Sequence, residues 1–113
     1  LTLLERLNYS YDVLESIDNT DIIKSYELVF EIKVATNNIE IDNLKNYKSY
    51  NKDLYNLIKD YKYSLHKVSY LLYKSYNKNL SMNELSSLQE FINKSALYRE
   101  SCNAIKELLE SEK

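Results

Sequence analysis

The stretch LKNYKSYNKDLYNLIKDYKYSLHKVSYLLYKSY, residues 44–76, places largely apolar side chains at alternating spacings of three and four residues. No Gly or Pro interrupts the stretch. This spacing is typical of an α-helix that packs against other helices, as in bundles and coiled coils. The pattern therefore predicts a long central helix over 44–76, with Asp42 as its N-cap. The stripe consists of Leu44, Tyr47, Asn51, Leu54, Ile58, Tyr61, Leu65, Val68, Leu72 and Ser75.

The chain before this stretch predicts further helices over 1–17 and 20–36. In the first, Leu4, Leu7, Tyr11 and Leu14 keep the helical spacing. In the second, the side chains expected to face inward are Ile22, Ile23, Tyr26, Val29, Phe30 and Val34. The sequence TNN at 36–38 favours a stop, because Asn tolerates the conformation in which helices end.

Residues 17–21 favour a break between these two helices. Asp18 is a candidate N-cap, and Ile17 and Ile22 have the spacing of a hydrophobic staple around it. The alternative is one continuous helix with a slipped repeat, since Leu14, Asp18 and Ile22 also continue one face. The first segment therefore contains one helix or two.

The last helix has the strongest local start signal in the chain. Ser81 and Glu84 have the spacing of a capping box, and Leu80 and Leu85 have that of a staple. The side chains expected to be buried on this helix, with Leu85 and Ile92 widening the stripe, are Leu88, Phe91, Ser95, Tyr98, Cys102, Ile105 and Leu109.

These patterns predict an all-α fold, an antiparallel up-and-down bundle of three long helical segments. The first segment is broken near 17–21, which makes three or four helices in total. The 113 residues fit one domain, 1–113, and the absence of Gly and Pro fits few connections. Since the chain begins with Leu, we expect a fragment of a longer protein. No apolar run in it approaches the roughly 18–20 residues that span a bilayer. The sequence leaves open whether membrane segments flank the chain and in which cellular compartment it lies.

Charge is unevenly distributed along the chain. Residues 1–42 contain nine acids and three bases, whereas 43–79 contain eight lysines and two acids. A basic central helix therefore lies between acidic segments, which favours attraction within the bundle.

The sequence shows no catalytic, cofactor or metal signature. His66, the single histidine, is expected at the surface or at the boundary of the core. Cys102 lies in an apolar stripe, where a thiol is usually inert. Phosphate-binding loops need glycine, and there is none. We therefore expect no enzyme, no cofactor and no metal.

The tyrosines are the unusual feature, with twelve in the chain. Tyr63 and Tyr70 are expected to project from the central helix among lysines. Another helix could cover both rings. If they are exposed, they favour contact with a protein, because Tyr is common at interfaces. Base stacking beside phosphate-binding lysines is less favoured, because the net charge is negative and Arg is scarce. The candidate partner-binding residues are Tyr63, Tyr70, Lys52, Lys59, Lys67 and Lys74.

The layout as a whole resembles helical-bundle sensor domains outside the bacterial membrane and three-helix adaptor domains. This resemblance is one of architecture and implies a non-enzymatic interaction module that binds a protein partner. In the sensor or receptor variant, a small ligand binds between helices and both ends of the domain lie at one end of the bundle. Two further hypotheses are a phosphate-rich partner on the Lys/Tyr face and a coiled-coil homodimer.

Overall fold

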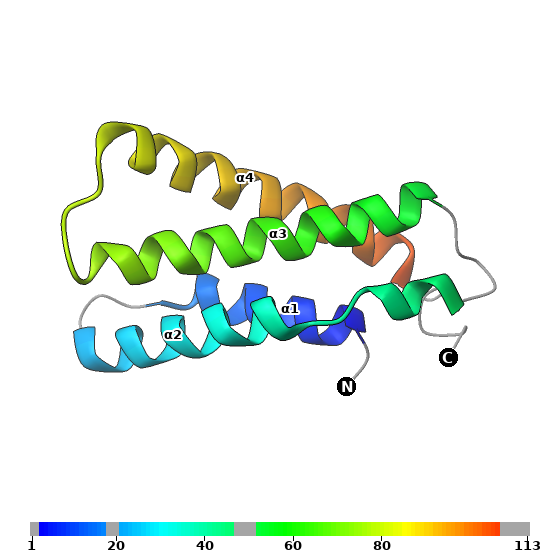
Figure 1. Cartoon of the computed structure of the whole chain (residues 1–113), viewed down its shortest axis with the longest axis horizontal. Coiled ribbons are helices and arrows are strands. Elements are labelled where there is room, and N and C mark those ends of the chain that lie inside the picture. Colours follow the sequence, from blue (N-terminus) through cyan, green and yellow to red (C-terminus); the bar gives the residue numbers. More distant parts are fainter. Residues whose placement is uncertain (1–2, 18–20, 47–51, 107–113) are drawn as a thin grey trace.

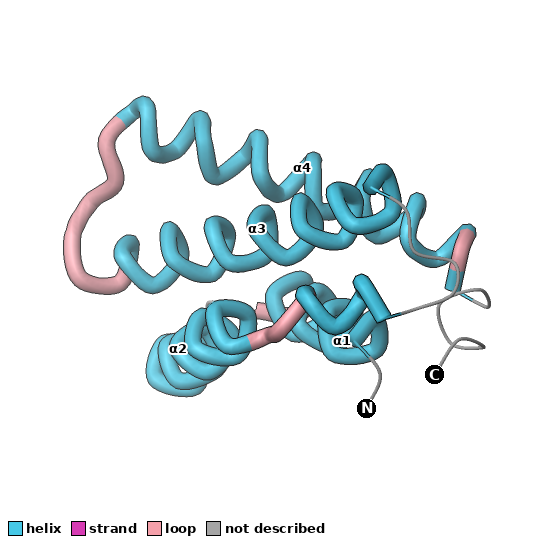
Figure 2. The backbone as a smooth tube through the Cα atoms, turned by 45° about the vertical axis from the view of Figure 1, so that its right-hand side comes forward, coloured by secondary structure: helices cyan, strands magenta, loops and turns pink. Residues whose placement is uncertain are grey.

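The computed structural model describes residues 3–17, 21–46 and 52–106. In these ranges it contains four α-helices and one 3-10 helix: α1 Leu3–Glu15, α2 Ile22–Asn38, η1 Asp42–Asn46, α3 Lys52–Ser75 and α4 Met82–Ala104. Successive α-helices run in opposite directions, with α1 and α2 beside the pair α3 and α4 (Figures 1 and 2). The prediction of an all-α antiparallel bundle is confirmed. The first segment consists of two helices, so the alternative with four helices is the correct one.

Helix α3 lies at the centre, with α2 on one side and α4 on the other, while α1 contacts the other three α-helices. The apolar stripe predicted for the central helix is buried along most of α3, whereas its members Leu72 and Ser75 are half-buried and exposed, respectively. Tyr47 and Asn51 of the same stripe lie outside the described residues. The core cluster consists of Leu4, Leu7, Ile39, Leu44, Leu54, Ile58, Tyr61, Leu65 and Cys102.

The predicted start of the central helix is wrong. Asp42 begins a 3-10 helix rather than capping α3, which starts at Lys52. The Tyr55 hydroxyl donates to Asp42 Oδ1 over 3.2 Å, and Lys45 Nζ lies 5.6 Å from the Tyr55 ring. In one continuous helix, residues 13 positions apart would be separated by about 20 Å. The chain reverses instead, and Leu44 is buried in the core beside Leu54.

The break between α1 and α2 is confirmed, but its predicted cap is wrong. Asp21, not Asp18, is the N-cap of α2, and its Oδ1 accepts from the Lys24 amide over 3.1 Å. Asp18 itself lies outside the described residues. With Asp21 as the cap, Ile22 is the first residue of the helix and is exposed, so Ile17 and Ile22 do not occupy the positions of the predicted staple.

The predicted inward face of α2 is also wrong at four of its six positions. Val29 is buried and Tyr26 half-buried, as expected. The side chains that are exposed instead are Ile22, Ile23, Phe30 and Val34. The buried positions are Ser25, Val29, Ile32 and Thr36, again spaced by three and four. The pattern missed this face because two of its members are small hydroxyl residues that count as polar, although they allow helices to pack closely.

Helix α4 follows its prediction at the start and in part along its length. Ser81 and Glu84 form the predicted capping box, with hydrogen bonds of 2.9 and 3.1 Å between each side chain and the other residue's amide. Ser95 and Cys102 are buried. Leu85 and Ile92 are exposed rather than part of the core. Helix α4 diverges from α3 toward its start (Figures 1 and 2). Leu109 lies outside the described residues.

Candidate functional site

The predicted partner-binding residues form one stripe along α3. Lys59, Tyr63, Lys67, Tyr70 and Lys74 follow one another at spacings of three and four, and Lys52 lies on the same side at the start of the helix. Tyr63 is 52% exposed and Tyr70 is 40% exposed. Of the two alternatives left by the sequence, the structure therefore shows the one in which both rings are exposed. We call these six residues the Tyr/Lys stripe.

The Tyr/Lys stripe borders α4, which fixes the orientation of two of its members. The Tyr63 ring meets the Phe91 ring edge-on, with centroids 5.6 Å apart. Lys74 forms an ion pair with Glu84, which also belongs to the capping box of α4. The pairing and the hydrogen bond from Ser81 lower the pKa of Glu84 to about 2.

The remaining lysines of the stripe differ in their surroundings. Lys67 is half-buried, with its Nζ 5.5 Å from the Tyr70 ring. Lys52 and Lys59 are exposed. On the neighbouring surface of α4, Lys94 pairs with Glu90 at 2.7 Å. Carboxylates therefore offset part of the positive charge of this surface, which leaves a mixed surface of tyrosine and lysine rather than a strongly basic one.

His66 lies at the boundary of the core, as predicted. Its Nδ1 is 3.1 Å from the hydroxyl oxygen of Thr36 on α2. Burial is the largest cause that lowers the pKa of His66, and the nearby lysines 33, 62 and 67 add to it. Among the described residues, the hydrogen-bonding partner of the ring is Thr36, so the His66–Thr36 pair joins α2 to α3.

Cys102 is fully buried, and burial raises the pKa of its thiol to about 12. A thiol with such a pKa is protonated at neutral pH and a poor nucleophile. Within 3–17, 21–46 and 52–106, no three His, Cys, Asp or Glu side chains form a group that could hold a metal ion.

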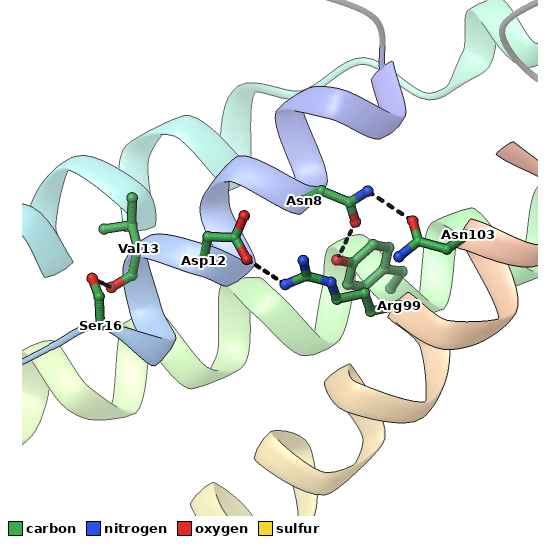
Figure 3. A network of polar contacts seen from close by, with 7 residues as sticks. Asn8, Asp12, Val13, Ser16, Arg99 and Asn103 are labelled. Carbon is green, nitrogen blue, oxygen red and sulfur yellow. Dashed lines mark hydrogen bonds and ion pairs between the residues drawn. The ribbon is translucent and has the colours of Figure 1, made fainter.

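Polar side chains join α1 to α4 at two positions one helical turn apart. Asn8 Nδ2 donates to Asn103 Oδ1 over 2.9 Å, and Asp12 pairs with Arg99 (Figure 3). The buried Tyr61 hydroxyl donates to Asn8 Oδ1 over 2.7 Å, which joins α3 to the same network. Because the helices are antiparallel, the contacts advance by four residues on α1 while they retreat by four on α4.

The next position in this series would bring Ser16 opposite Ser95, but α1 ends at Glu15. The Ser16 hydroxyl instead donates to the Val13 carbonyl over 2.8 Å (Figure 3). Ser95 is 3% exposed, and among the described residues its hydroxyl has no hydrogen-bond partner. An unsatisfied buried polar group costs about 1–3 kcal/mol. Other buried hydroxyls behave differently: those of Thr36 and Ser69 donate to carbonyls of their own helices.

A cavity of about 360 Å³ lies at this end of α1, between α1, α3 and α4, and Ser95 is part of its lining. At 1.5 Å per residue, the 13 residues of α1 span about 20 Å and the 24 of α3 about 36 Å. Helix α1 therefore covers only part of the groove between α3 and α4. Much of the cavity wall is apolar, formed by Leu14, Leu65, Val68, Leu72 and Ile92. Sequence reasoning missed this site, and only the small polar residue Ser95 in an otherwise apolar stripe could have indicated it.

No helix in the described part of the chain combines the length and apolar character needed to cross a membrane. Comparison with protein-family models, with curated proteins and with solved structures finds no match to this chain.

Proposed function

We propose that this chain is a non-enzymatic interaction module whose Tyr/Lys stripe binds a protein partner. The observation that supports this most is the exposure of Tyr63 and Tyr70 on one face of a helix whose other face is buried. Tyrosines contribute large apolar area together with a hydrogen-bonding hydroxyl, and they are enriched at the centres of protein interfaces.

The surroundings of the two rings favour binding because they reduce its entropic cost. Tyr63 is held against Phe91, and Tyr70 lies beneath the Lys67 side chain. Side chains that are already ordered lose less freedom when a partner binds. Lys59 and Lys67 add positive charge around the rings, so a partner surface with carboxylates is the best match.

A phosphate-rich partner is less well supported by the same surface. Lys74 is engaged with Glu84, and Lys94 with Glu90. Nucleic-acid binding needs several lysines or arginines free to neutralise phosphates, and its affinity falls steeply with salt. The salt dependence of binding therefore separates the two hypotheses.

The sensor or receptor variant requires both ends of the domain at one end of the bundle. The start of α1 and the end of α4 lie at the same end of the bundle (Figure 1), and the contact between Asn8 and Asn103 agrees with this. The arrangement supports a domain attached at that end, with the loop between α3 and α4 at the opposite end.

A matched set of variants tests the proposal. Tyr63→Ala combined with Tyr70→Ala removes both exposed rings, while Tyr9→Ala removes a ring of α1 that is also 52% exposed. Partners captured by the wild-type chain are identified and purified, and their affinities are measured by calorimetry. We expect the double variant to bind at least about tenfold more weakly, since interface tyrosines often contribute more than 1 kcal/mol each.

The control variant Tyr9→Ala should bind like the wild type, and circular dichroism should show all variants folded. Equal affinity of the double variant and the wild type for every partner would show that the stripe is not the contact surface. Binding that disappears between about 50 and 200 mM salt would favour a phosphate-rich partner instead.

A further inference from the structure

We propose that the cavity at the end of α1 binds a small molecule with an apolar ring system and one hydrogen-bonding group, which pairs with the Ser95 hydroxyl. This site is separate from the Tyr/Lys stripe and does not depend on the function proposed for it. Its lining comes from the end of α1, the middle of α3 and the middle of α4.

The first argument is the unpartnered hydroxyl of Ser95. Ser95 is almost fully buried and belongs to the lining of the cavity, and its hydroxyl has no hydrogen bond inside the described part of the chain. It occupies the position where a third contact between α1 and α4 would follow Asn8–Asn103 and Asp12–Arg99. A ligand group that donates to Ser95 Oγ would replace the contact that α1 is too short to make.

The second argument is the size and character of the cavity. Small-molecule sites are mostly apolar, contain few polar groups and have volumes of about 300–1,000 Å³. The cavity lies near the lower limit at about 360 Å³. Because a cavity of about 150 Å³ accommodates benzene, this one fits roughly a two-ring molecule.

The third argument is the charge around the cavity. Glu15 and Tyr11 belong to its lining, while the nearby Arg99 pairs with Asp12 and lies 4.4 Å from the Tyr11 ring. The guanidinium group of Arg99 is therefore already paired with a carboxylate. The carboxylate of Glu15 in the lining repels an anionic ligand. A neutral or cationic ligand fits this lining better than a carboxylate or a phosphate.

Four probes with related rings test the proposal on the full chain. Indole carries a ring N–H that can donate to Ser95, whereas indene has a similar shape and lacks it. Tryptamine adds a positive charge and indole-3-acetate a negative one. We expect saturable shifts of the backbone amides of Leu65, Val68 and Ser95 in NMR titrations with indole. Tryptamine should bind at least as tightly as indole, and indole-3-acetate about tenfold more weakly.

Two variants and a control locate the binding. Ile92→Trp fills the cavity from its rim, and because Ile92 is already 41% exposed, the fold should tolerate the change. Leu97→Trp places the same side chain at a 63% exposed position of α4 outside the cavity lining. Indole binding should be lost in the first variant and retained in the second.

Ser95→Ala isolates the hydrogen bond. We expect it to weaken indole binding about fivefold, the effect of one ordinary hydrogen bond, and to leave indene binding unchanged. If Ser95→Ala changes the affinities for indole and indene by the same factor, the Ser95 hydroxyl does not contact the ligand. Its assignment as the hydrogen-bonding group of the site is then wrong. If none of the four probes binds the wild-type chain saturably, or if indole binds Ile92→Trp as it binds Leu97→Trp, the cavity is not a ligand site. Loss of the Tyr63 and Tyr70 rings should leave probe binding unchanged.

Discussion

Helix α2 contains two isoleucines with opposite surroundings, and replacing each with alanine tests the buried face assigned to this helix. Ile32 is 1% exposed. Its replacement removes three buried carbon groups, worth about 0.8 kcal/mol each, or about 2.4 kcal/mol together. The space left behind adds to this cost, and measured values for such changes are about 2–5 kcal/mol. We expect Ile32→Ala to lower the free energy of unfolding by about 3 kcal/mol.

Ile23 is 75% exposed, so the same replacement there should have little effect. Only about a quarter of the transfer free energy, about 0.6 kcal/mol, is lost. The higher helix propensity of alanine offsets about 0.4 kcal/mol of it. We expect Ile23→Ala to change the free energy of unfolding by about 0.2 kcal/mol.

Urea unfolding followed by circular dichroism measures the free energy of unfolding of both variants. Because both carry the same substitution on the same helix, they differ in the burial of the side chain that is replaced. Each variant is measured at two protein concentrations. Similar losses for the two variants would refute the assignment of Ser25, Val29, Ile32 and Thr36 as the buried face. A loss for Ile23→Ala that grows with protein concentration would show that a second copy covers this exposed face of α2.

Further predictions concern the polar contacts and the buried thiol. Tyr61→Phe should cost about 1 kcal/mol in urea unfolding, because Asn8 loses a donor but can still reach water. Burial lowers the pKa of His66, so its stabilising contribution is full above the unfolded value of about 6.5 and falls as pH decreases through it. In His66→Gln, the free energy of unfolding should therefore change less between about pH 7.5 and pH 5.5 than in the wild type. Ser81→Ala should cost about 1 kcal/mol, measured in the same way, because it removes the N-cap of α4. Cys102 should react with a disulfide reagent at pH 8 at least about a hundredfold more slowly in the folded chain than in urea.

The fold class could be predicted because apolar spacing and capping signals are local. The stripe of α3 and the capping box of α4 each depend on residues within a few turns of one another. The two errors at helix starts have a common cause. Asp18 and Asp42 are both good cap residues, but a cap is used only where the helix behind it packs. Asp21 caps α2 instead through a local hydrogen bond with Lys24, and Asp42 accepts a hydrogen bond from Tyr55 across the reversal of the chain.

The buried face of α2 could not be predicted from hydrophobicity. Ser25 and Thr36 are buried while Ile23 and Phe30 are exposed. The Thr36 hydroxyl is satisfied within its own helix by the Ile32 carbonyl, so its burial costs little. Hydrogen bonding within the helix therefore allows a polar residue on the buried face of α2, and this cannot be read from a spacing of three and four.

The two candidate sites, the Tyr/Lys stripe and the cavity beside Ser95, also differ in how far the sequence could predict them. The angular position of Tyr63 and Tyr70 among lysines followed from the sequence, but whether another helix covers the rings depends on the packing of α4. The cavity depends on where α1 ends relative to α3 and α4, which is a property of three elements together. Ser95 was predicted to be buried, and it is, but nothing in the sequence shows that its hydroxyl lacks a partner.

The polar contacts between α1 and α4 explain why the cavity is not closed by a shift of α1. A shift by one turn toward the cavity would separate Asp12 from Arg99 and Asn8 from Asn103, and would place Asp12 near Ser95 and Asn8 near Arg99. The Tyr61 hydroxyl, fully buried beside Asn8, would lose its acceptor. Polar residues at helix interfaces fix register in this way, because alternative registers leave them unpaired. The network therefore holds α1 at the far end of the groove, and the unfilled space beside Ser95 follows from the register that these residues specify.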